Sequence, residues 1–148
     1  MATVDDDHFT KILQDLVKLD YDAIAAYEEA IERLSDEDAR AHLRSYCEDH
    51  RRHTQNLAPF ISERGADVPQ AAGAMKILTE GKVKLAGVVG SDKAVLSAML
   101  ANEEVTNKSY EKAVEHGETS PEILAVLREN LADERRHREW IKSAIDQH

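Results

Sequence analysis

The chain has 148 residues, of which 29 are acidic and 19 basic, so its formal net charge is −10, and only 5% of it is aromatic. This length suits one compact domain spanning residues 1–148. The sequence pI of about 5.1 argues against a protein that binds nucleic-acid phosphates, because such proteins need clustered Lys and Arg.

The sequence also argues against a membrane protein and against a thiolate metal centre. It contains no run of about 18 apolar residues that could span a bilayer. The first residues are acidic where a signal peptide would be basic, so we expect a cytoplasmic protein. Cys47 is the only cysteine, which leaves no C-x-x-C pair. Any bound metal must therefore use histidine and carboxylate ligands.

Two helices are predicted in the first half of the chain. Apolar residues recur at steps of three and four, and no alternating Val, Ile and Thr segment suggests a strand, so the protein should be all-α. An acidic cluster at residues 5–7 suits the N-cap of a first helix over about residues 6–34. A Ser-Asp-Glu-Asp start at residues 35–38 opens a second helix over about residues 36–63.

The second half of the chain adds two more helices after a long connection. Residues 65–91 are rich in Gly and carry a weaker helical pattern, which predicts a crossover containing a short helix. The third helix is expected over about residues 92–116. The fourth, with a capping Ser followed by Pro, should cover about residues 121–146. Connections that are short, long and short predict a four-helix bundle of two antiparallel hairpins, with the second and third helices parallel.

The two predicted hairpins resemble each other in sequence. Similar segments begin at two tyrosines, YEEAIE at Tyr27 and YEKAVE at Tyr110. The two tyrosines are 83 residues apart (110 − 27). The segment DHRRH at residues 49–53 matches DERRH at residues 133–137, 84 residues later (133 − 49). The half-chain pattern is therefore duplicated.

Six polar side chains of this repeat are expected in one layer of the core. Asp20 and His50 each lie 15 residues from the loop of the first hairpin, roughly 22 Å along a helix. Glu103 and Glu134 lie about 15.5 residues from the second loop, at nearly the same height. His53 and His137 lie one helical turn beyond His50 and Glu134. The six candidate metal ligands are Asp20, His50, His53, Glu103, Glu134 and His137.

Acidic and histidine side chains in a core need compensation, because burying an isolated charge costs several kcal/mol or forces its neutralisation. A pair of divalent ions would compensate them, since carboxylate oxygens and imidazole nitrogens suit iron, manganese or zinc. Alternatively, the histidines donate hydrogen bonds to the carboxylates without a metal. A metal-free layer, or one with a structural zinc ion, would belong to a non-enzymatic binding or interaction module. Six ligand-type side chains in one layer of a repeat favour the metal site.

The fourth helix carries an E-x-x-H motif, Glu134 to His137, and the third helix carries the single acid Glu103. In this pattern the whole chain resembles the ferritin-like di-metal proteins, which include ferritins and rubrerythrins. That family uses one Glu from each of two helices and an E-x-x-H from each of the other two. The resemblance implies a homodimeric non-haem iron or manganese redox protein acting on Fe(II), oxygen or peroxide.

The sequence departs from the ferritin-like pattern at two ligand positions. Asp20 stands where Glu is usual, and His50 stands where the other E-x-x-H would supply a bridging carboxylate. The resulting three carboxylates and three imidazoles are less anionic than usual, so we expect one tight ion and a weaker second one, or a single ion. Without C-x-x-C pairs the chain also has no rubredoxin-type domain, and its electrons would come from substrate iron or another protein.

Three tyrosines and one cysteine are expected around the ligands. Tyr27 and Tyr110 can reach back toward the site, because helical side chains lean toward the N-terminus, although either could be an ordinary aromatic core residue. Tyr46 is a near neighbour of His50 in the sequence, and Cys47 is expected to be a small core residue. The arginines of the repeat should pair with surface acids or contact the ligands from outside; they are Arg51, Arg52, Arg135 and Arg136.

Overall fold

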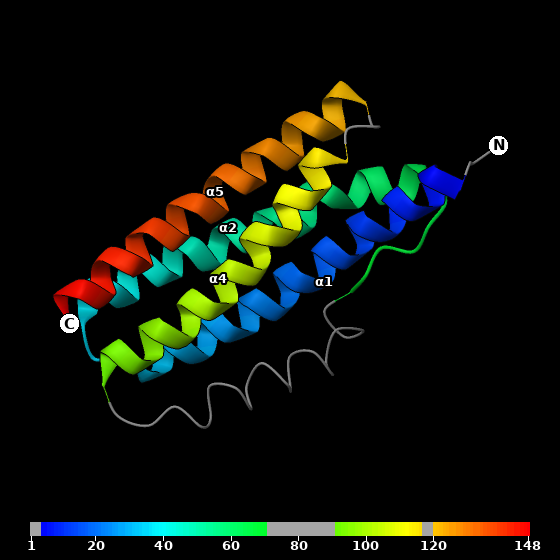
Figure 1. Cartoon of the computed structure of the whole chain (residues 1–148). Helices are drawn as coiled ribbons and strands as arrows, with labels where there is room; N and C mark the ends of the chain where they lie inside the picture. Colours follow the sequence, from blue (N-terminus) through cyan, green and yellow to red (C-terminus); the bar gives the residue numbers. More distant parts are fainter. Residues whose placement is uncertain (1–3, 71–90, 117–119) are drawn as a thin grey trace.

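The computed structural model describes residues 4–70, 91–116 and 120–148, and four long helices account for most of them. These are α1 (Val4–Arg33), α2 (Glu37–Glu63), α4 (Asp92–Glu115) and α5 (Pro121–Gln147) (Figure 1). The described residues contain no strand, so the predicted all-α four-helix bundle is confirmed. The short helix predicted in the crossover lies outside the described residues.

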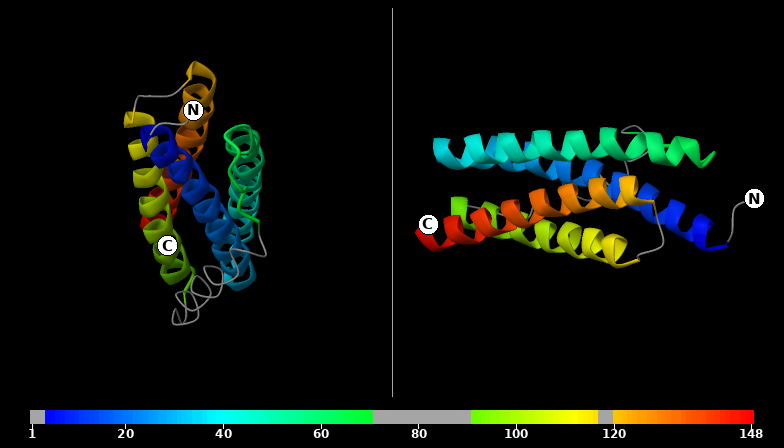
Figure 2. Two further views of the ribbon diagram at one scale, coloured as in Figure 1. Left: turned by 90° about the vertical axis from the view of Figure 1, so that its right-hand side faces the viewer. Right: turned by 90° about the horizontal axis from the view of Figure 1, so that it is seen from above.

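The helices form two hairpins that pack side by side. α1 packs against α2 and α4 against α5, and the two hairpins meet where α1 contacts α4 and where α2 contacts α5. α2 and α4 run in the same direction, so each helix is antiparallel to both neighbours that it contacts (Figures 1 and 2). No helix in the described part of the chain is long and apolar enough to cross a membrane.

Local sequence sets the N-terminal ends of the helices. Asp36, Ser91 and Ser120 are the N-caps of α2, α4 and α5, and each side chain accepts a hydrogen bond from a backbone N–H two or three residues later. α1 begins at Val4. The acidic residues 5–7, expected at its N-cap, therefore lie inside the helix and not before it.

A polar layer divides the apolar core into two clusters. On α1, Val17 belongs to one cluster and Ala23 to the other, and the fully buried Asp20 lies between them. The same order, one apolar cluster, a polar segment and then the other cluster, holds along α2, α4 and α5. Apolar side chains therefore cover the polar layer from both ends of the bundle.

Candidate metal centre

All six predicted ligands lie in the polar layer, and none is more than 1% exposed. They form two overlapping groups of four, and within each group the candidate ligand atoms lie within 4.8 Å of one another. The Asp20 group consists of Asp20, His50, His53 and Glu134. The Glu103 group consists of His50, Glu103, Glu134 and His137. Two of the six side chains, His50 and Glu134, therefore belong to both groups.

The internal repeat accounts for the existence of two groups. Its offsets pair each candidate ligand with a counterpart in the other hairpin; the pairs are Asp20 with Glu103, His50 with Glu134, and His53 with His137. Exchanging every member of the Asp20 group for its counterpart produces the Glu103 group. The duplicated sequence thus produces two candidate ion positions whose ligands correspond to each other under the repeat.

The spacing of the donor atoms in the Asp20 group suits a small divalent ion. Asp20 Oδ1 lies 2.8 Å from His50 Nδ1 and 3.2 Å from His53 Nδ1. His53 Nδ1 in turn lies 3.3 Å from Glu134 Oε1. Donor atoms at roughly 2.1 Å from one ion lie about 3.0–3.4 Å from each other at octahedral or tetrahedral angles. The four atoms are therefore close to the distances that a shared ion requires.

The Glu103 group is slightly wider. Glu103 Oε1 lies 3.4 Å from His50 Nε2 and 3.5 Å from His137 Nδ1, and His137 Nδ1 lies 3.8 Å from Glu134 Oε2. The two carboxylate oxygens of Glu134 thus face different groups, and so do the two ring nitrogens of His50. These two side chains occupy the positions between the candidate ions.

Two buried ligand atoms in the layer have no hydrogen-bond partner among the residues that the structure describes: Glu134 Oε1 and His137 Nδ1. An unsatisfied buried polar atom costs about 1–3 kcal/mol. Glu134 Oε1 faces the Asp20 group, and His137 Nδ1 faces the Glu103 group. A cation bound in each group would therefore give each atom a partner. The donor set and its unpaired atoms therefore fit a bound metal.

Two aspartates that the sequence analysis did not assign hold the outer nitrogens of the ligand histidines. His53 Nε2–H donates to Asp133 Oδ2 at 2.9 Å, and His137 Nε2–H donates to Asp49 Oδ2 at 2.8 Å. Such bonds fix the ring orientation and leave Nδ1 pointing at the ion position. The available signal was that both aspartates occupy the first position of the duplicated segments.

Two arginines close the outer side of these aspartates, between α2 and α5. Arg136 donates to Asp49 at 2.7 Å and to Asp133 at 3.1 Å. Arg52 donates to Asp49 at 3.2 Å and also to Asp133. The other two arginines of the repeat pair with surface acids; these ion pairs are Arg51 with Glu28 and Arg135 with Glu111. The expected pairing with surface acids therefore applies to Arg51 and Arg135. Arg52 and Arg136 instead contact the two aspartates that hold the ligand histidines.

Tyr27 and Tyr110 donate hydrogen bonds to candidate ligands across the interface between the hairpins. Tyr110 on α4 donates to Asp20 Oδ2 on α1 at 2.6 Å, and Tyr27 on α1 donates to Glu103 Oε1 on α4. Burial raises the pKa of both phenols well above its usual value, and the facing carboxylates raise it further. Each phenol thus stays protonated and holds the acid of the other hairpin.

Tyr46 and Cys47 lie at the edge of the layer. The Tyr46 ring packs on the ring of His137, with centroids 4.2 Å apart. Cys47 is buried, and its thiol lies 3.8 Å from the carbonyl oxygen of Ile24. Burial raises the pKa of this thiol, which disfavours the thiolate form that a metal would require.

Thr106 and Asn107 hydrogen-bond to Glu134, which belongs to both groups. The sequence pattern alone did not identify these two residues. Thr106 Oγ1 donates to Glu134 Oε2 at 3.0 Å. Asn107 Nδ2 donates to the backbone oxygens of Glu103 at 2.7 Å and Glu134 at 3.1 Å. Their spacing, three and four residues after Glu103 on the buried face of α4, was the signal that could have identified them.

Protons compensate the carboxylates in the metal-free layer. Burial lowers the pKa of His53, but hydrogen bonds to carboxylates outweigh this and raise it to about 10. The same balance raises the pKa of His137 to about 9. Burial raises the pKa of Asp20, yet hydrogen bonds from two histidines hold it below its usual value. Burial dominates for Glu134, whose pKa is raised. Divalent ions binding here would therefore displace protons from imidazoles.

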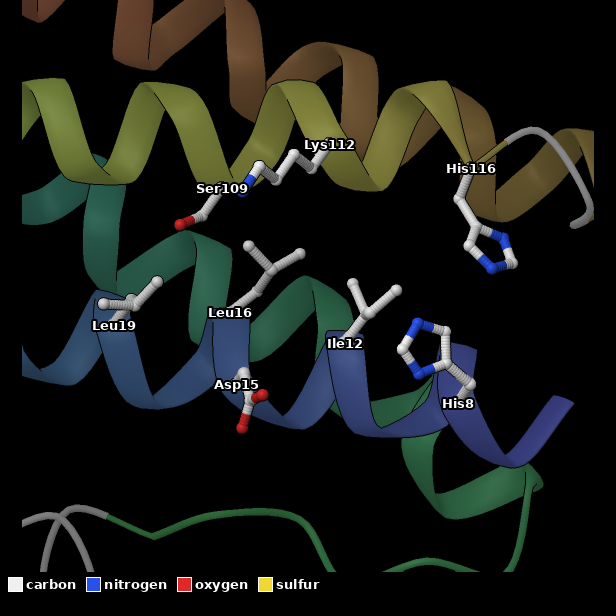
Figure 3. Close-up of a pocket in the computed structure, with 8 residues that line it drawn as sticks. All are labelled: His8, Ile12, Asp15, Leu16, Leu19, Ser109, Lys112 and His116. Carbon is white, nitrogen blue, oxygen red and sulfur yellow. The ribbon is translucent and has the colours of Figure 1, made fainter. Parts of the chain in front are cut away.

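A surface depression near α1 is separate from this layer. It has a volume of about 390 Å³ and lies between α1 and α4, with Ile12, Leu16 and Leu19 on one wall (Figure 3). His8 and His116 close one end, with ring centroids 5.8 Å apart. None of the six candidate ligands lines it.

A family model described as "Domain of unknown function (DUF2383)" matches residues 8–116. This range includes four of the candidate ligands, whereas Glu134 and His137 lie beyond its end. No curated protein and no solved structure matches the chain. Because the family model covers more than half of the sequence, the chain belongs to the DUF2383 family.

Proposed function

We propose that this chain is a ferritin-like metal-binding protein that holds up to two iron or manganese ions in the polar layer and acts on Fe(II), oxygen or peroxide. The proposed ligands are Asp20, His50, His53, Glu103, Glu134 and His137. The single observation that carries the proposal is the presence of unpaired buried ligand atoms, Glu134 Oε1 and His137 Nδ1, inside two four-donor groups. The homodimer and the cytoplasmic location expected from the sequence stay predictions.

The donor chemistry favours a first-row transition metal. Imidazole nitrogens together with carboxylate oxygens suit iron, manganese and zinc, whereas calcium and magnesium prefer oxygen ligands alone. The described site contains no thiolate, because Cys47 points to a backbone carbonyl. A mixed nitrogen and oxygen set is compatible with a metal that changes its oxidation state.

The surrounding side chains prepare the ligands before any ion arrives. Asp133 and Asp49 hold the outer nitrogens of the ligand histidines, and Thr106 holds one oxygen of Glu134. Tyr27 and Tyr110 orient Glu103 and Asp20 by hydrogen bonds. A bound iron or manganese ion would supply the change of oxidation state and a binding position for an oxygen species.

His50 distinguishes this site from the ferritin-like pattern that it resembles. Its Nδ1 lies 2.8 Å from Asp20 in one group, and its Nε2 lies 3.4 Å from Glu103 in the other. A neutral imidazole has one lone pair on its ring nitrogens and can serve one ion, while Glu134 can serve both. This supports the expectation of one tighter and one weaker ion.

Anaerobic loading of the metal-free protein with Fe(II) tests the proposal. We expect binding of one or two ions per chain and, after oxygen is admitted, near-ultraviolet absorption from ferric iron held by the protein. His137→Ala should lower the iron content and the melting temperature. The matched control is His8→Ala, because His8 is exposed and outside the layer. Failure to bind metal would contradict the proposal and would indicate a metal-free network, in which His137→Ala would still lower the melting temperature because the hydrogen bond to Asp49 is lost.

A structural zinc site is the second candidate function. The observation that favours it is closure: each group offers four donors, and all of them are at most 1% exposed. Structural zinc sites are four-coordinate and closed, whereas catalytic sites keep an open position. Tight binding of zinc without any reaction of the iron-loaded protein with oxygen or peroxide would support this function and contradict the redox proposal.

A further inference from the structure

The two halves of the polar layer differ on the side where α2 meets α5. The 84-residue offset pairs Tyr46 with Asn130 and Asn56 with Trp140. Across the α2–α5 interface, Asn56 meets Asn130 and Tyr46 meets Trp140. Asn56 and Asn130 exchange two hydrogen bonds, at 2.9 and 3.1 Å, whereas the rings of Tyr46 and Trp140 lie edge to face with centroids 6.0 Å apart. One half therefore has amides where the other half has two readily oxidised aromatic rings.

The aromatic pair extends from a candidate ligand to the surface of the bundle. The Tyr46 ring lies 4.2 Å from the ring of His137. The Tyr46 ring also contacts Trp140. Trp140 is only partly buried and stacks on His42, with centroids 4.1 Å apart and an interplanar angle of 14°. Consecutive rings are thus in contact from His137 to a partly exposed indole. In the described part of the other half, the amide pair offers no such continuous series of rings.

We infer that the Trp140–Tyr46 contact is the route by which single electrons travel between the protein surface and the buried centre when peroxide is reduced there. The inference rests on the proposed function, because it needs a redox-active ion beside His137. Trp140 is the residue that is transiently oxidised, and the Tyr46 ring is the contact through which the electron passes to His137. A soluble one-electron reductant, such as a small reduced redox protein, restores Trp140 at the surface.

The electron balance is complete with these reactants. Reduction of one peroxide to two waters consumes two electrons and two protons, breaks the O–O bond and takes its protons from water. Loss of each electron leaves Trp140 as an indole radical cation that keeps its N–H proton, and one electron from the surface reductant then restores the neutral indole. The relay itself forms no bond and transfers no proton. A soluble donor therefore never needs to enter the enclosed layer.

Transient absorption after photo-oxidation tests this route without any measurement of turnover. Trp140 is the only tryptophan of the chain, so a soluble ruthenium photo-oxidant produces one defined indole radical. The protein is loaded anaerobically with Fe(II) or, as a redox-inert match of equal charge, with Zn(II). An electron from Fe(II) can fill the hole through the same contact. We expect a radical lifetime severalfold shorter with Fe(II) than with Zn(II).

Variants on the two halves separate the route from general packing. Tyr46→Leu should remove the difference between the Fe(II) and Zn(II) forms, and Tyr46→Phe, which keeps the ring, should retain it. Asn130→Ala, at the counterpart position, should also retain it. Equal lifetimes in the two metal forms of the unmodified protein, or a difference that survives in Tyr46→Leu, would overturn the inference. Metal analysis of the same samples identifies the failing step: bound iron with equal lifetimes rejects only the route, and absence of both metals rejects the proposed function as well.

Discussion

The imidazole of His53 on α2 is held by Asp133 on α5, whose Oδ2 accepts the hydrogen bond of Nε2–H at 2.9 Å. The repeat produces the same contact with the hairpins exchanged, from His137 on α5 to Asp49 on α2 at 2.8 Å. Each hairpin therefore orients a candidate ligand of the other. Neither group of four is complete until the two hairpins have packed together.

Removal of one of these aspartates should weaken metal binding without removing a ligand. In Asp133→Ala the His53 ring loses the partner that directs Nδ1 inward, and loss of such an outer contact typically costs about 10–100-fold in metal affinity. Competition with a chelator of known affinity measures the effect. The control Glu129→Ala changes an exposed acid on the same helix and should leave affinity unchanged. Equal affinities for both variants would contradict the orienting role.

The two overlapping groups predict different metal contents for two similar substitutions. Asp20 belongs to one group, so Asp20→Asn should lower the binding of one ion and spare the other. Glu134 belongs to both groups, so Glu134→Gln should weaken both ions. Each substitution removes one negative charge and keeps the side-chain shape. Elemental analysis after anaerobic titration gives the number of ions per chain, and identical results for the two variants would exclude two distinct positions.

The metal-free protein should lose thermal stability as the pH rises through the alkaline range. The pKa values of His53 and His137 are raised from 6.5 to about 10 and about 9. A proton that the folded state binds more tightly than the unfolded state contributes stability that is complete below the ordinary pKa and is lost as pH passes the raised value. The decline should therefore fall between about pH 6.5 and pH 10.

Calorimetry in the presence of a chelator measures this decline. The metal-loaded protein should lose less stability across the same window, because deprotonated imidazoles bind the ion better. A melting temperature of the metal-free protein that is flat or rises between pH 6.5 and pH 9 would contradict protonated histidines in the layer.

The hydrogen bonds of the buried phenols should contribute measurably to stability. Tyr110→Phe removes a 2.6 Å bond to the charged Asp20, and a bond to a charged group contributes about 1.5–3 kcal/mol. We expect a loss of this size in the free energy of unfolding by urea. The matched control is Tyr21→Phe, since Tyr21 is only partly buried, with an expected change of at most about 0.5 kcal/mol. Similar losses in both variants would contradict a specific contribution of the bond between Tyr110 and Asp20.

The sequence by itself determined the helical architecture and the height of the polar layer. Helix positions follow from apolar periodicity and from caps such as Ser120 before Pro121, which are local properties of the chain. The height of Asp20, His50, Glu103 and Glu134 follows from counting residues from each loop, because the rise per residue of a helix is constant. Six side chains could therefore be assigned to one layer, and the structure brings them together.

Only the tertiary structure decided which atoms meet across the hairpins. Spacing along a helix gives height and face, but the contacts of Asp49 with His137 and of Tyr110 with Asp20 depend on how two hairpins rotate and slide against each other. The same register makes Glu134 and His50 common to both groups. It also places Tyr46 between Trp140 and His137. Such pairings form between segments more than 80 residues apart in sequence, so local patterns contain no information on which partner each side chain finds.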